Sequence, residues 1–193
     1  MRVVLFGDSL TFGYGVWPKD NLASLLQQAR PQWEILNRGV NGDTTREAEE
    51  RFEADVLSCH PDLVTFFFGS NDSAPGEGNY RTLVEFTNRY GRMMDQLKAA
   101  FPNAKAMIIT PPPVDETVFM PWNENRRLIP YCQACRTLAK ERHLLLADFW
   151  NTMQEASQGN LAPFLQEDGC HLSERGYLLL RDTILSALFD VSL

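Results

Sequence analysis

The chain has 193 residues, 44% of them hydrophobic, which is enough for one domain with a substantial core. Its formal net charge of −7, without a basic cluster, argues against nucleic acid or an anionic membrane surface as a partner. We find no apolar run of the roughly 20 residues that would insert stably into a membrane, and no signal peptide. We therefore expect a single domain over residues 1–193 in the cytoplasm, where the cysteines stay reduced.

The first predicted element is a buried strand at the start of the chain. Residues 2–6 form an apolar run rich in β-branched side chains, and the run stops at Gly7. Ser9 follows two residues later, so this strand delivers a hydroxyl group to an edge of the sheet. Leucines at helical spacing over residues 22–29 then predict a helix with Asp20 as its N-cap.

Four more segments are predicted to be strands: residues 33–37, 62–68, 104–110 and 143–148. The second of these is apolar on both faces, which is typical of a parallel sheet covered by helices. Helical periodicity follows the strands, and Thr44 with Glu47 fits a capping box at one helix start. Residues 69–78 are predicted to form a loop.

The alternation of strands and helices predicts an α/β fold with three layers, helix on sheet on helix. We expect an open, five-stranded parallel sheet of the flavodoxin-like type, with strand order 2-1-3-4-5. In such sheets the ligand binds beyond the carboxyl ends of the strands, where the strand order reverses. The site is therefore expected between strands one and three.

Polar or flexible residues come after each of the first three strands, at the edge where the site is expected. Ser9 follows the first strand, Gly42 the second and Asn71 the third. A serine that attacks a carbonyl needs donors for the oxyanion, and the backbone N–H groups of Ser9 and Gly42 and the amide of Asn71 are candidates. Taken alone, Gly42 and Asn71 are also what an ordinary turn would contain.

Of the three histidines, only His171 lies in a loop beyond the carboxyl end of a strand, because His60 and His143 precede strands. Asp168 stands three residues before His171, a spacing that lets its carboxylate reach Nδ1 in a turn and orient the imidazole. A turn ahead of the last helix is the plain alternative for this segment. Asp148 is a rival acid, for which we favour a helix-capping role.

Four segments, in order, resemble the sequence blocks of the SGNH, or GDSL, hydrolase family. They are Gly7-Asp8-Ser9-Leu10, the glycine at position 42, Gly69-Ser70-Asn71-Asp72 and Asp168-Gly169-Cys170-His171. Gly39 competes with Gly42 for the second block, and we choose Gly42 because it directly precedes Asp43-Thr44. The compact layout and the three prolines at 111–113 most resemble the isoamyl-acetate-hydrolysing esterase branch.

The resemblance implies a serine ester hydrolase that uses no metal or organic cofactor and cleaves small carboxylic esters through an acyl-enzyme. It assigns Ser9 as nucleophile, His171 as base and Asp168 as its orienting acid, with Ser9, Gly42 and Asn71 forming the oxyanion hole. A lysophospholipase, a thioesterase or a carbohydrate acetylesterase would use the same residues. A non-catalytic flavodoxin-like module, with residues 7–15 around a phosphate, is the alternative from another class.

Three further features stay open to more than one interpretation. Cys132 and Cys135 share an apolar helical stripe, so we read them as core residues and not as a redox pair. Cys170 is expected to point away from the site if His171 faces it. The apolar segment 111–127 either lines the substrate pocket or forms a contact in a homo-oligomer.

Overall fold

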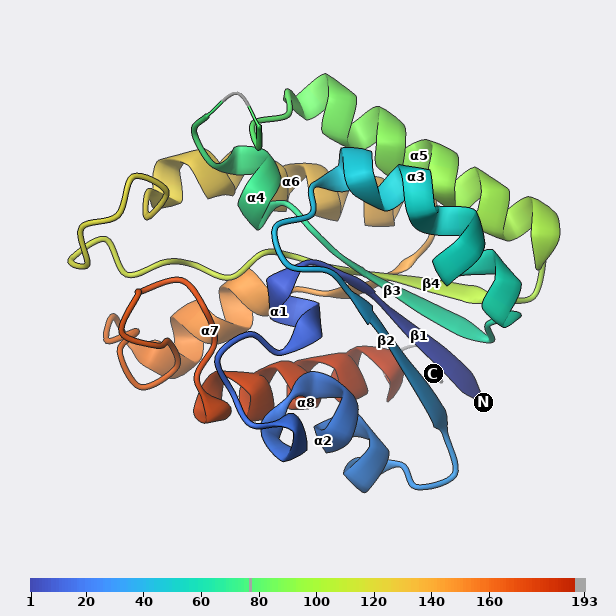
Figure 1. The fold of residues 1–193 in the computed structure, drawn as a ribbon, viewed down its shortest axis with the longest axis horizontal. Helices are drawn as coiled ribbons and strands as arrows, with labels where there is room; N and C mark the ends of the chain where they lie inside the picture. Colours follow the sequence, from blue (N-terminus) through green and yellow to red (C-terminus); the bar gives the residue numbers. More distant parts are fainter. Residues whose placement is uncertain (77, 190–193) are drawn as a thin grey trace.

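Five parallel strands form the centre of the computed structural model, which describes residues 1–76 and 78–189 (Figure 1). The strands are β1 (Arg2–Gly7), β2 (Glu34–Gly39), β3 (Leu63–Phe67), β4 (Lys105–Ile109) and β5 (Leu145–Ala147). Their order is β2-β1-β3-β4-β5, which confirms the predicted topology. The order reverses between β1 and β3, so the two strands beside the expected site are direct neighbours.

Helices cover both faces of this sheet, which confirms the three-layer prediction (Figure 1). One face packs against α2 (Leu22–Ala29), α7 (Phe149–Ser157) and α8 (Glu174–Phe189). The other face packs against α3 (Thr45–Asp55), α5 (Leu83–Ala100) and α6 (Asn125–Glu141). Four short helical segments make up the remaining regular structure: α1 (Ser9–Phe12), η1 (Pro18–Asp20), η2 (Leu57–Cys59) and α4 (Ser70–Ser73).

The apolar strands are buried on both faces because each contributes alternate side chains to the two cores. Along β1, Val3 and Leu5 pack in the cluster that includes α2 and α8, whereas Val4 and Phe6 pack in the cluster that includes α3 and α5. All four side chains are at most 1% exposed. Burial of this kind contributes about 1.5–3 kcal/mol for each large aliphatic or aromatic side chain. The strand that precedes Ser9 is therefore buried inside the sheet, between β2 and β3.

Two local predictions are wrong. The segment 69–78 is not a simple loop, because Ser70–Ser73 form one helical turn, α4, directly after β3. So short and polar a turn has no apolar periodicity from which it could be recognised. The N-cap of α2 is Asn21 and not Asp20, since Asn21 Oδ1 accepts the N–H of Ser24 at 2.9 Å.

The capping box at the start of α3 is confirmed, with Thr44 and Glu47 each bonding the other's backbone N–H. His60 and His143 lie before β3 and β5, at the amino edge, and both are exposed with a positive φ. They are boundary residues, as expected. Among the described residues, no helix is both long and apolar enough to cross a bilayer.

Candidate active site

Ser9 is placed by the tight turn that joins β1 to α1. Asp8 caps α1, because its Oδ1 accepts the N–H of Leu10 at 2.9 Å, and Ser9 is then the first helical residue. A Cβ on Gly7 would lie 2.0 Å from Oγ1 of Thr11, so a glycine is needed for α1 to fold back onto the end of β1. The turn therefore points the Ser9 N–H and Oγ toward the carboxyl edge of the sheet.

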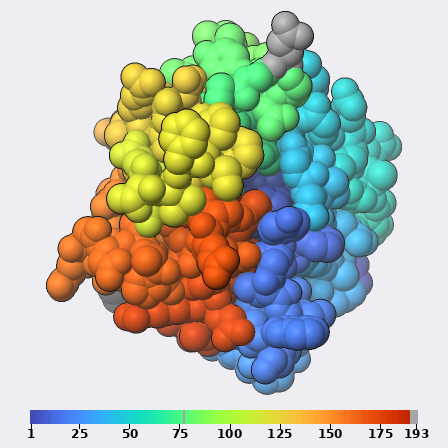
Figure 2. Space-filling view, turned by 60° about the vertical axis from the view of Figure 1, so that its left-hand side comes forward, coloured from blue at the N-terminus to red at the C-terminus, as the bar shows by residue number. Residues whose placement is uncertain are grey.

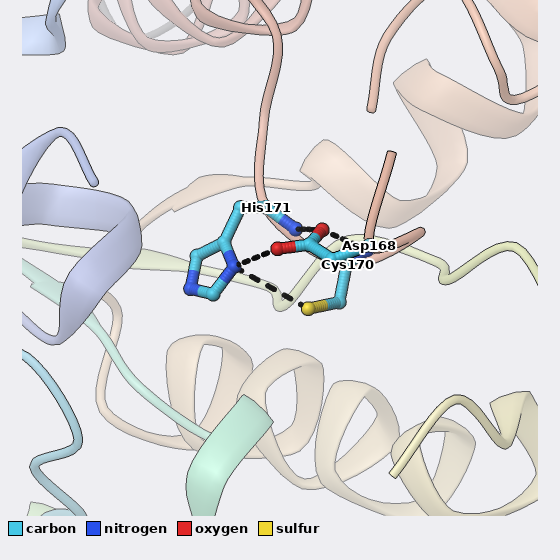
Figure 3. A group of neighbouring side chains, drawn as sticks. All are labelled: Asp168, Cys170 and His171. Carbon is cyan, nitrogen blue, oxygen red and sulfur yellow. Dashed lines mark hydrogen bonds and ion pairs between the residues drawn. The ribbon is translucent and has the colours of Figure 1, made fainter. Parts of the chain in front are cut away.

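A chain of polar contacts connects Ser9, His171 and Asp168. Nε2 of His171 lies 3.1 Å from Oγ of Ser9, and Nδ1 lies 2.6 Å from Oδ2 of Asp168 (the latter contact is drawn in Figure 3). These distances are those of hydrogen bonds. With a proton on Nδ1, the free lone pair of Nε2 faces the serine hydroxyl, which is the arrangement a general base requires.

The loop before α8 stabilises the ionised form of Asp168. Its Oδ1 accepts the backbone N–H groups of Cys170 at 3.0 Å and of His171 at 2.9 Å. Burial alone would raise the pKa of Asp168, but these two bonds and the His171 side chain outweigh it and lower the pKa. Asp168 is therefore ionised at neutral pH and can stabilise a positive charge on His171.

A second set of contacts, which the sequence analysis missed, clamps this loop against the one that follows α1. Gln166 donates its backbone N–H to the carbonyl of His171, and its Nε2 donates to the carbonyls of Tyr14 and Leu172, all at 2.8 Å. The Tyr14 ring lies beside the His171 imidazole, with centroids 4.4 Å apart. A Cβ on Gly15 would come within 2.1 Å of Gln166 Oε1, so a glycine makes this approach possible.

The three expected oxyanion donors line the same pocket as His171. Among the described residues, neither the N–H of Ser9 nor that of Gly42 donates a hydrogen bond. Asn71 Nδ2 donates one hydrogen to the carbonyl of Asp43 at 2.9 Å, and its other neighbour, Asp8 Oδ2, is as far as 3.5 Å. The Asp43 contact orients the amide, and the long contact with Asp8 is the weaker of its two hydrogen bonds.

Gly42, and not Gly39, is the glycine that reaches the pocket. Gly42 has a φ of +83° and nothing within 4 Å of where its Cβ would stand. Gly39 ends β2, where a Cβ would lie 2.2 Å from the backbone nitrogen of Phe12. Gly39 therefore allows β2 and α1 to approach, whereas the left-handed backbone at Gly42 exposes its N–H.

Arg51 on α3 connects the segments that carry these donors. Its guanidinium donates to the carbonyl of Gly7 at 3.0 Å, to the carbonyl of Arg38 at 2.9 Å and to Oδ2 of Asp43 at 2.6 Å. It also lies over the ring of Phe6, 4.4 Å from the centroid. A single cation thus holds the ends of β1 and β2 and the loop before α3 in register.

Two carboxyl groups are buried behind the site. Burial raises the pKa of Asp8 to about 7 and that of Asp72 to about 6, although hydrogen bonds to each oppose the rise. Asp72 accepts the N–H of Thr45 at 3.0 Å and its Oγ1 hydroxyl at 2.5 Å. This carboxyl joins α4 to the start of α3.

We expect Asp72→Asn to weaken the pH dependence of folding stability. The pKa of Asp72 in the folded chain, about 6, exceeds its usual 3.8, so the folded state binds the proton more tightly than the unfolded state. The resulting stabilisation is lost as pH rises through 6. The Tm of the wild type should rise as the pH is lowered from about 6.5 to about 4.5. Asp72→Asn keeps an acceptor for Thr45 and should show a smaller rise in Tm over the same range. Asp182→Asn, at an exposed carboxylate, is the control, and equal slopes in all three proteins would contradict the expectation.

The site opens into a pocket of about 520 Å³, the size of a small-molecule site. Its apolar wall comes from the loop after α4 and from segment 111–128: Ala74, Pro75, Pro112, Val114, Trp122 and Leu128. In the space-filling view of Figure 2, the yellow segment 111–127, the orange loop before α8 and the blue loop after β1 meet on one face. Part of segment 111–127 therefore lines the pocket that contains Ser9. Phe119 of the same segment is 95% exposed.

The prediction for Cys170 is wrong. Its Sγ lies 3.5 Å from Nδ1 of His171 and faces the same pocket (Figure 3). Burial, followed by the charge of Asp168, raises the pKa of this thiol to about 12, so it is not a nucleophile at neutral pH. Cys132 and Cys135, by contrast, are buried core residues as predicted.

Asp148 has the structural role that the sequence suggested. Its side chain caps α7 by accepting the N–H of Asn151, and it forms a two-pronged ion pair with Arg136 at 2.8 and 2.9 Å. The guanidinium lowers the pKa of Asp148 in spite of its burial. This carboxylate is therefore already fully engaged away from His171.

Comparisons with known proteins agree with this geometry. The model of the GDSL-like Lipase/Acylhydrolase family matches residues 5–179. The chain is 31% identical, over 96% of its length and 76% of the relative's, to "GDSL esterase/lipase WDL1" of Oryza sativa. It is 31% identical, over 91% of its length and 76% of the relative's, to the Homo sapiens "Isoamyl acetate-hydrolyzing esterase 1 homolog". The crystal structure of a lipase/acylhydrolase from Enterococcus faecalis superposes with a TM-score of 0.83 at 28% identity, covering 96% of this chain and 93% of the other.

Proposed function

Because the chain belongs to the GDSL-like lipase/acylhydrolase family and is a carboxylic ester hydrolase, we propose that it cleaves small carboxylic esters through an acyl-enzyme on Ser9. The observation that supports this most directly is the chain of contacts from Ser9 Oγ through His171 to Asp168. Membership of this family also argues against the non-catalytic flavodoxin-like alternative.

In the proposed first step, Ser9 Oγ attacks the ester carbonyl while Nε2 of His171 takes its proton. Negative charge then develops on the carbonyl oxygen, beside the N–H groups of Ser9 and Gly42 and the amide of Asn71. The imidazolium that forms is stabilised by the Asp168 carboxylate, and the Tyr14 ring beside it adds a favourable cation–π contact. His171 next protonates the leaving alkoxide, and the alcohol departs.

In the proposed second step, water attacks the acyl group on Ser9. His171 is neutral again and removes a proton from the water, and the same three donors hold the second oxyanion. Collapse of this intermediate returns the proton from Nε2 to Oγ and releases the carboxylic acid. The positions of the site residues need not change between the two steps.

The lining of the pocket favours an apolar, uncharged substrate. Apolar side chains form most of one wall, and none of the described residues that line the pocket is Lys or Arg. A phosphate-bearing lysophospholipid or thioester would therefore find no cationic partner there, and the chain's net charge of −7 would repel it. A relative named for isoamyl acetate hydrolysis supports the same class, an acetate of a short apolar alcohol.

The proposal is tested with a substrate panel. Acetate, butyrate and octanoate esters of p-nitrophenol and of isoamyl alcohol would be compared with acyl thioesters, a lysophospholipid and an acetylated xylo-oligosaccharide. Ser9→Ala serves as the blank. We expect the highest kcat/KM among the short-chain esters of p-nitrophenol and isoamyl alcohol, and a preference for the phospholipid or the sugar would contradict the proposed substrate class.

Asn71→Ala should lower kcat for p-nitrophenyl acetate by about 10²–10³-fold. The variant removes the one side-chain donor of the proposed oxyanion hole and keeps both backbone donors. Steady-state kcat and KM are the measurement, with Asn79→Ala, an amide that lines the same pocket farther along the chain, as the comparison. An unchanged kcat with a raised KM would assign Asn71 to substrate binding instead.

A further inference from the structure

Three possible metal ligands lie together at the edge of the pocket. They are Sγ of Cys170, Nδ1 of His171 and a carboxylate oxygen of Asp168, all within 4.8 Å of one another (Figure 3). Each residue is partly exposed and lines the pocket, so an ion can reach them from the solvent. Ester hydrolysis by Ser9 and His171 gives the thiol no task.

The distance between the sulfur and the nitrogen matches that of a tetrahedral Zn²⁺ site. With Zn–S near 2.3 Å and Zn–N near 2.0 Å, the sulfur and nitrogen bound to one ion are about 3.5 Å apart. Sγ of Cys170 and Nδ1 of His171 are separated by the same 3.5 Å. Nδ1 and Oδ2 of Asp168 are 2.6 Å apart and would have to separate to about 3.3 Å, a side-chain movement of about 0.7 Å.

We propose that Cys170, His171 and Asp168 form a binding site for Zn²⁺, and that the bound ion inhibits the enzyme reversibly. A water molecule from the pocket would complete the four ligands. The mixture of thiolate, imidazole and carboxylate suits this borderline-soft cation and disfavours Mg²⁺ and Ca²⁺, which prefer oxygen ligands alone. The binding step stands on the cluster itself, whereas the inhibition rests on the proposed role of His171.

Inhibition follows from a change of tautomer. The active histidine carries its proton on Nδ1 and offers the lone pair of Nε2 to Ser9. When Zn²⁺ occupies Nδ1, that proton leaves and Nε2 takes one up, so the ring becomes a donor toward Ser9 Oγ and can no longer accept its proton. The thiol also releases its proton, so one proton in total enters the solvent for each ion bound.

Binding is measured first, without reference to activity. Co²⁺ replaces Zn²⁺ as a probe because a thiolate bound to it gives a charge-transfer absorption band in the near ultraviolet. We expect this band in the wild type and in Cys59→Ala, which removes a partly exposed thiol at the opposite edge of the sheet. We expect no band in Cys170→Ala. A missing band in the wild type, or a band that persists in Cys170→Ala, would overturn the site.

Inhibition is measured on the same three proteins, each relative to its own rate in metal-free buffer. Zn²⁺ should inhibit the wild type and Cys59→Ala, and EDTA should restore both. In Cys170→Ala the concentration for half-inhibition should rise at least about tenfold, because one of three ligands is lost. Binding by the Co²⁺ band without any loss of activity would overturn the inhibition, and would also count against His171 as the base. If the purified protein cleaved no ester, the band would still test the site.

Discussion

Replacing Ser9 with alanine should lower the rate of p-nitrophenyl acetate hydrolysis by about a thousandfold or more, while the fold stays intact. The substitution removes the oxygen atom that lies 3.1 Å from Nε2 of His171 and leaves the base without a hydroxyl to deprotonate. The backbone donors remain, so a small residual activity is expected from oxyanion stabilisation of direct attack by water. Initial rates would be measured together with far-ultraviolet circular dichroism and Tm.

Ser58→Ala is the matched control, since it makes the same substitution on the η2 turn at the amino edge of the sheet. Its rate and Tm should stay close to those of the wild type. A Ser9→Ala protein that kept more than about a tenth of the wild-type rate would exclude Ser9 as the nucleophile, because loss of a nucleophile costs several orders of magnitude.

The fold was predictable because its decisive signals are local. The apolar run that becomes β3 is buried on both faces, and that pattern alone requires helices on each side of a parallel sheet. Once the sheet is parallel, every carboxyl end lies at one edge, so the residues after β1, β2 and β3 must lie near one another. This is why Ser9, Gly42 and Asn71 could be grouped although up to 62 positions separate them, from 9 to 71.

The supporting contacts could not be predicted, because they depend on pairings across long sequence distances. Gln166 donates a hydrogen bond to Tyr14 across 152 positions. Arg51 donates hydrogen bonds to carbonyls of two strands and to the carboxylate of a loop. Neither residue has a local pattern that distinguishes it from an ordinary surface residue. Only the glycine at 15, beside the Gln166 side chain, hints at a close approach, and a loop glycine alone does not say to what.

Cys170 shows why a neighbour in sequence can be misplaced. In an extended segment, adjacent side chains point in opposite directions, which would turn Cys170 away from the pocket that His171 faces. The segment is not extended, because Asp168 Oδ1 accepts the N–H groups of Cys170 and His171 and so bends the backbone into a turn. Both side chains therefore face the pocket, and this produces the cluster proposed to bind Zn²⁺.

Asp168→Asn should lower kcat by about 10³–10⁴-fold while KM changes little. The asparagine oxygen can still accept the N–H groups of Cys170 and His171, so the loop should keep its shape. Its NH₂ group, however, faces Nδ1, which must then become an acceptor, and the proton moves to Nε2. A histidine in that tautomer cannot accept the proton of Ser9.

Asp148→Asn is the comparison that separates this effect from a general loss of negative charge. Asp148 is bound to Arg136 and to the start of α7, away from His171, so its amide variant should retain nearly full kcat even if its Tm falls. Alanine variants would remove side-chain volume, whereas the two amides are isosteric with the acids they replace. A loss of less than about tenfold in Asp168→Asn would show that His171 needs no orienting carboxylate, because a reversed tautomer alone should cost far more.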